Sequence, residues 1–151
     1  MSAKKNYEIL AKKNKGLPDW KWLKANFKVK DEGEALETVR TAIVDKIEGV
    51  TKGIIEPIIS GQESYGCWFD RKILENEDGK FMFNAYKDFQ AIMWESNKIS
   101  FSGKKQDYII WLKSVKKRWD MHSPILEKIC DKLSKGWEKY KKKDVPNTYH
   151  G

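Results

Sequence analysis

The chain is poor in the residues from which most metal and redox sites are built. Its 151 residues include two cysteines, Cys67 and Cys130, and two histidines, His122 and His150. Two cysteines are too few for a disulfide framework, and they lie too far apart for the paired spacing of a zinc site. We therefore expect two buried or partly buried thiols, no bound metal and no cofactor.

Glycines are too scattered to build a loop that cradles phosphate groups. Gly49, Gly53 and Gly61 do not form the close cluster that nucleotide-binding loops require. With few nucleophiles and few acid–base candidates, the sequence favours a binding protein over an enzyme.

Long apolar runs are also missing. No stretch of eighteen apolar residues occurs, so we expect no membrane span. The charged start, with Lys4 and Lys5, is not followed by the apolar run of a signal peptide. These absences predict an intracellular, cytoplasmic protein.

Apolar and aromatic residues are sufficient for one core. They make up 40% and 13% of the chain, and 151 residues is a usual size for a single domain. We predict one domain over residues 1–151, with frayed tails at 1–5 and 143–151.

The strongest periodic pattern runs from Ala35 to Ile59 and predicts a central amphipathic helix. Its apolar residues recur at steps of three and four, so they share one helical face. Pro57 should end or kink this helix, and Gly49 and Gly53 should let a neighbouring backbone approach closely. The residues of the apolar face are Leu36, Val39, Ile43, Ile47, Val50, Ile54 and Ile58.

The remaining pattern predicts a mainly α fold of five or six helices with one β-hairpin near residues 66–86. Two aromatic-rich runs, 67–69 and 81–83, flank the turn-like segment 75–79, which favours a hairpin. Two long amphipathic patterns follow, separated by Ser123 and Pro124. Because Ser and Pro are typical of a helix start, we predict a C-terminal antiparallel helical hairpin with its corner there.

Charge is strongly segregated along the chain, whose net charge is +8. Residues 1–30 carry nine lysines against two acidic residues, and residues 98–151 carry fourteen basic against six acidic residues. The middle, 31–97, carries fourteen acidic against seven basic residues. Either the basic ends recruit an acidic partner, or they fold back onto the acidic middle and neutralise it.

A lysine row on the last predicted helix makes nucleic acid the first candidate for an acidic partner. The chain has only three arginines, the residues whose guanidinium groups make bidentate hydrogen bonds to base edges. Such binding should therefore lack base specificity. A solvated helix face is the other interpretation. The candidate contacts are Lys113, Lys117, Lys128, Lys132, Lys135, Lys139 and Lys142.

Two further hypotheses remain. In the first, the protein is an adaptor or inhibitor that anchors a protein partner through Trp22 or Trp68. A homo-oligomer is a separate expectation to which the sequence assigns no residues. In the second, Arg118 and His122 face one anionic group and cleave a phosphodiester. A histidine that interacts with the last carbonyls of a helix is the alternative interpretation of the second pattern.

Overall fold

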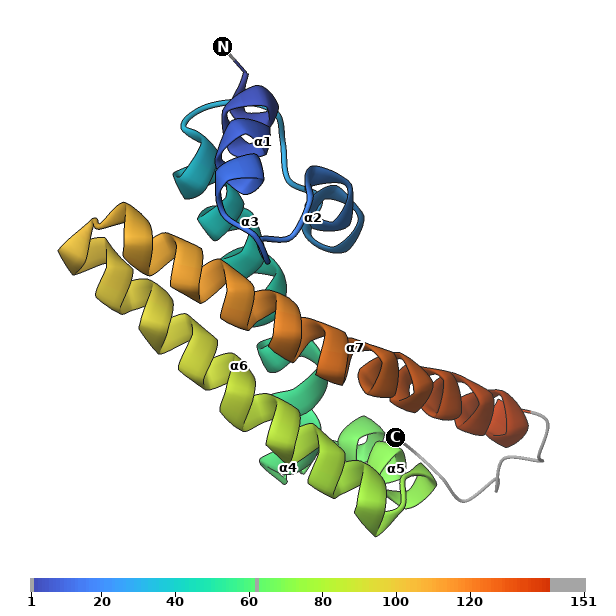
Figure 1. Cartoon of the computed structure of the whole chain (residues 1–151). Coiled ribbons are helices and arrows are strands. Elements are labelled where there is room, and N and C mark those ends of the chain that lie inside the picture. Colours follow the sequence, from blue (N-terminus) through green and yellow to red (C-terminus); the bar gives the residue numbers. More distant parts are fainter. Residues whose placement is uncertain (1, 62, 142–151) are drawn as a thin grey trace.

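The computed structural model describes residues 2–61 and 63–141, and within them the fold is built from helices without any strand. Two long antiparallel helices, α6 (Asn76–Ser102) and α7 (Lys105–Lys141), form its longest feature (Figure 1). The turn between them contains Gly103, whose φ of 60° is the left-handed conformation that glycine tolerates at a helix end. The predicted mainly α class is confirmed.

The N-terminal segment is ordered by helix caps and by burial. Ser2 caps α1 (Ala3–Lys13) by accepting a hydrogen bond from the Lys5 backbone N–H, and Ala3 is buried. Residues 3–5 of the predicted frayed end at 1–5 thus lie in the first turn of α1. The predicted tail at 143–151 lies outside the described residues.

The second short helix, α2 (Trp20–Phe27), joins the N-terminal segment to α7. Trp119 of α7 packs its ring 4.9 Å from the Phe27 ring, and its Nε1–H donates to Asn26 Oδ1 at 2.9 Å. These contacts hold α2 against the middle of α7.

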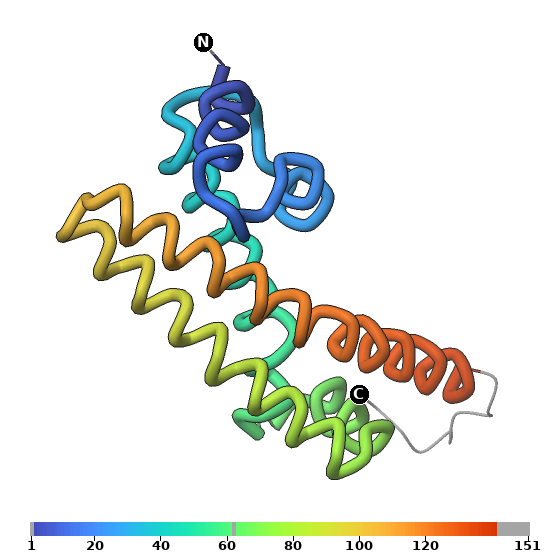
Figure 2. Tube along the Cα trace, in the orientation of Figure 1, coloured from blue at the N-terminus to red at the C-terminus, as the bar shows by residue number. Residues whose placement is uncertain are grey.

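The predicted central helix is present and reaches Ile59, but its middle is wound more widely. It consists of α3 (Ala35–Val50), a π-helical segment η1 (Thr51–Ile55) and α4 (Glu56–Ile59). Figure 2 shows this run crossing one side of the α6–α7 pair. Its buried face supplies the centre of the core.

The π segment explains how the chain passes Pro57 without a break. Proline lacks an N–H and its ring crowds the carbonyl four residues earlier, so a widened turn just before it relieves both problems. A π turn holds one residue more than an α turn, so the residues that follow it are rotated around the helix axis. As a result, Thr51 and Ile55 are buried, whereas Val50 and Ile54 are only partly buried. The predicted close approach at Gly49 and Gly53 is wrong, since a Cβ there would meet no atom within 4 Å.

The predicted β-hairpin at 66–86 is wrong, because both aromatic runs are helical. Residues 67–69 lie in α5 (Tyr65–Ile73), which Ser64 caps, and residues 81–83 lie in α6. The acidic turn signal is the start of α6: Glu75 and Asp78 form a reciprocal capping box. Acidic residues favour a helix N-terminus as well as a turn, so the same residues fit both interpretations.

The predicted corner at Ser123 and Pro124 is also wrong. Pro124 lies inside the continuous helix α7, and the antiparallel hairpin is instead formed by α6 and α7. An interior proline costs a helix about 3 kcal/mol. Burial of His122, Leu126 and Ile129 on both sides of Pro124 offsets that cost.

Candidate functional site

Three large aromatic side chains project from the outer face of α6. Phe83, Trp94 and Phe101 are 50%, 70% and 94% exposed. Their spacings of eleven and seven residues put them within about 20° of one another around the helix. We call these three residues the aromatic row.

Two lysines of α6 stand beside the aromatic row. Lys87 and Lys98 are exposed, and each is four residues from an aromatic side chain of the row. Lys87 Nζ lies 5.2 Å from the centroid of the Phe83 ring. The outer face of α6 therefore interleaves aromatic rings and positive charge.

The outward face of α7 carries the lysines that the sequence singled out. Lys117 and four later lysines are exposed and fall within about 60° of one another around the helix. We call this set the lysine row: Lys117, Lys128, Lys132, Lys135 and Lys139. Lys113 lies off this face, with its stem 3.5 Å from the position of a Cβ at Gly16, and Lys142 is outside the described residues.

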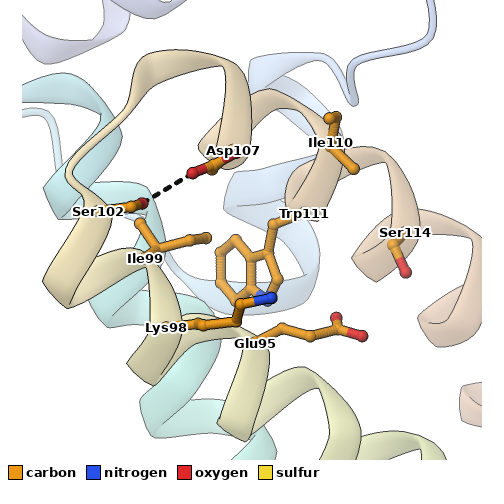
Figure 3. A pocket seen from close by; sticks show the side chains of 8 residues that line it. All are labelled: Glu95, Lys98, Ile99, Ser102, Asp107, Ile110, Trp111 and Ser114. Atoms are coloured by element: carbon orange, nitrogen blue, oxygen red, sulfur yellow. Dashed lines mark hydrogen bonds between the residues drawn. The ribbon is translucent and has the colours of Figure 1, made fainter.

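A groove of about 290 Å³ near the α6–α7 turn lies between the two outer faces (Figure 3). The Trp111 indole lies across its floor, and its Nε1–H donates to the Ile92 carbonyl at 3.0 Å. Ser102 donates to Asp107 at 2.7 Å at one end of the groove. The lining residues are Glu95, Lys98, Ile99, Ser102, Asp107, Ile110, Trp111 and Ser114.

Arg118 and His122, the candidate catalytic pair, are paired with carboxylates of α6. Arg118 donates to both oxygens of Glu95 at 3.2 and 3.1 Å. His122 is only 6% exposed, lies 2.5 Å from Asp88 Oδ2 through Nε2, and meets the Phe89 ring edge-on. These contacts join the two helices and engage the side chains of Arg118 and His122, so they offer no support for the phosphodiesterase hypothesis.

Two members of the lysine row have partners. Lys132 donates to both oxygens of the buried Asp78 at 3.0 and 2.9 Å, and Lys135 pairs with Asp131 at 2.8 Å. Within the described part of the chain, Lys117, Lys128 and Lys139 have no carboxylate at ion-pair distance. The acidic middle thus takes up one lysine of the row and leaves three open.

The Asp78 pair makes stability depend on pH. Burial alone raises the pKa of the Asp78 carboxyl, but hydrogen bonds from Lys132 and from the Glu75 N–H hold that pKa below its usual value. A carboxyl whose pKa is lowered on folding stabilises the fold above its unfolded pKa, about 3.9, and loses that contribution as pH falls through the folded pKa.

We therefore expect Asp78→Asn to lower the free energy of unfolding near neutral pH and to have a smaller effect at about pH 2. Urea denaturation at both pH values measures this. Asp131→Asn is the control, because Asp131 and Lys135 are both well exposed. An Asp78→Asn effect that is equal at the two pH values contradicts the prediction.

The two tryptophans predicted as partner anchors differ in their surroundings. Trp22 is half-buried, donates through Nε1–H to Asp120 at 3.1 Å, and has Lys116 Nζ 5.3 Å from its ring. Trp68 is exposed on α5 with Lys72 Nζ 5.1 Å from its ring. Trp22 is thus engaged within the fold, whereas Trp68 is exposed at the surface, with the Tyr65 ring 5.7 Å away.

The sequence interpretation missed the aromatic row. Reading residues 66–86 as a hairpin separated Phe83 from Trp94 and Phe101 and hid their common face. The available signal was the helical spacing of these three residues, opposite the buried positions Met82, Ala85, Phe89, Ile92 and Ile99.

Comparisons of this chain with protein-family models, with curated proteins and with solved structures find no match. The described residues contain no cluster of three or more His, Cys, Asp or Glu side chains arranged to hold a metal ion. Cys67 is half-buried but Cys130 is exposed, so the prediction that both thiols are at least partly buried is wrong for Cys130. No helix in residues 2–61 and 63–141 has the length and apolar character needed to cross a membrane. The outer face of α6 and α7 is therefore the candidate functional site.

Proposed function

We propose that the protein is a cytoplasmic, non-enzymatic binding protein that holds nucleic acid without base specificity through the lysine row of α7. The observation that carries this proposal is a set of exposed lysines on one face of one helix that meet no carboxylate among the described residues, namely Lys117, Lys128 and Lys139. A row of this kind follows a phosphate backbone.

Charge pairing around the row supports the same function. Glu95 and Asp88, which lie between α6 and α7, are already paired with Arg118 and His122. A polyanion that approaches this side therefore meets the ammonium groups of the row together with the exposed Glu127 and Glu138, which lie beside Lys128 and Lys139 on the same helix. Because lysine acts as a point charge, the contacts should be to phosphate groups and insensitive to base identity.

The test is the double charge reversal Lys128→Glu/Lys139→Glu, assayed by fluorescence anisotropy with DNA and RNA at two salt concentrations. Affinity at low salt should fall by about tenfold or more. The slope of log K against log salt should become shallower by about 0.7–0.9 for each phosphate group that the variant no longer neutralises.

Lys12→Glu/Lys46→Glu is the matched control, because it changes the net charge equally at exposed lysines of α1 and α3. Equal loss of affinity in the two double variants would show a diffuse charge effect and overturn the assignment to α7. Absence of binding by the wild-type protein at low salt would overturn the nucleic-acid function itself and leave the adaptor hypothesis.

A further inference from the structure

The aromatic row on α6 gives this surface a second chemical character. We infer that the outer face of α6 and α7 binds single-stranded nucleic acid, with Trp94 and Phe101 stacking on unpaired bases while lysines contact the backbone. This inference rests on the proposed nucleic-acid function and specifies its substrate class.

Exposure of the aromatic row is the first observation behind the inference. Trp94 and Phe101 are far more exposed than most large apolar side chains, and the exposed Ile110 lies across the groove from Lys98. Open aromatic and aliphatic surface that is rimmed by polar groups marks an interaction site. Phosphate binding by the lysine row alone would give these exposed aromatic rings no role.

Charge complementarity identifies the occupant as an anion with aromatic groups. Lys87 and Lys98 lie beside the aromatic row on α6, and Lys117 of the lysine row is next to Arg118, which reaches Glu95 beside Trp94. The carboxylates between the helices are engaged by Arg118 and His122. Aromatic platforms beside a basic track are the combination that binds single strands with little sequence preference.

The dimensions fit a short single strand. Trp94 and Phe101 are seven residues apart, about 10 Å along the helix axis, and the whole aromatic row spans about 27 Å. A stacked strand rises about 3.4 Å per nucleotide, so the row covers roughly eight nucleotides. A binding site of about four to sixteen nucleotides is usual for such surfaces.

A duplex could contact the lysines of this face but not its aromatic rings. Its bases are already stacked on one another and present edges in the grooves, so exposed rings have no base face to meet. Phosphates of a duplex would still reach the lysines. The face should therefore prefer a single strand to a duplex, and that preference should depend on the aromatic row.

The test compares the wild-type protein with Trp94→Ala/Phe101→Ala on a thymidylate oligonucleotide of about twelve nucleotides and on a duplex of the same length. The double variant should lose about tenfold or more in affinity for the single strand and less than about twofold for the duplex. Its salt dependence should stay unchanged, because no charge is removed. In the wild type, the single strand should quench tryptophan fluorescence, and Trp94→Phe should remove most of that quenching.

Ile9→Ala is the control, since Ile9 is an exposed apolar residue but lies on α1. Equal losses for strand and duplex, or no loss, would overturn the stacking role while lysine-dependent binding could persist. Binding to phosphatidylserine vesicles that depends on Trp94 and Phe101, without preference for single strands, would instead assign the face to a lipid surface. If the wild type binds neither nucleic acid at low salt, both proposals fail.

Discussion

Phe89→Ala is expected to lower the free energy of unfolding by about 3–5 kcal/mol, the range for removing a large buried aromatic side chain. Phe89 is 0% exposed, and its ring lies 5.8 Å from that of Trp119 and 5.8 Å from that of His122. Its loss leaves a cavity where α6 and α7 meet, next to the pair formed by His122 and Asp88.

Chemical denaturation of Phe101→Ala supplies the matched comparison, because both phenylalanines lie on α6 and only one is buried. Phe101 is exposed, so its truncation should change the free energy of unfolding by no more than about 0.5 kcal/mol. A cost for Phe101→Ala close to that for Phe89→Ala would mean that Phe101 is covered in solution. The aromatic row would then not be an open surface.

Gly136→Ala is expected to destabilise the protein by about 1–3 kcal/mol, although alanine is the better helix former. A Cβ on Gly136 would lie 2.6–2.7 Å from three side-chain atoms of Ile73 in α5. Because one of those atoms is Cγ2, attached directly to Cβ, rotation of the end of the Ile73 side chain cannot relieve the contact. The two helices must separate.

Gly49→Ala should have the opposite sign, with a gain of about 0.5–1 kcal/mol, since a Cβ there meets nothing within 4 Å. Thermal or urea unfolding measures both variants. The double variant Gly136→Ala/Ile73→Ala should cost less than the sum of its single substitutions, because each relieves the other. A stabilising Gly136→Ala would refute the close approach of α5 to α7.

Local periodicity was sufficient to predict the central helix but not its winding. Val39, Ile43 and Ile47 are fully buried as their spacing indicates. The π segment that carries the chain past Pro57 changes which residues are buried, and nothing in the apolar pattern announces it. Pro124 shows the same limit, since a proline that would end an isolated helix is retained where buried neighbours hold both flanks.

Of the candidate site, only the lysine row on α7 could be predicted from the sequence. The lysine spacing that places Lys128, Lys135 and Lys139 on one face was evident in the sequence. Which lysines meet carboxylates was not, because Asp78 lies 54 residues from Lys132 and their pairing depends on how α6 and α7 pack. The aromatic row could be recognised only once α6 was known to begin at Asn76, because Phe83 then lies on the same helix as Trp94 and Phe101.

The 27-residue length of α6 has a consequence for recognition. Because Trp94 and Phe101 belong to one helix whose opposite side is buried, their separation is preset before any ligand arrives. Little conformational entropy is then lost on association, so modest contacts can suffice for binding. Insertion of a single residue between them would rotate one ring about 100° around the helix axis relative to the other. The two rings would then no longer lie on the same side of α6.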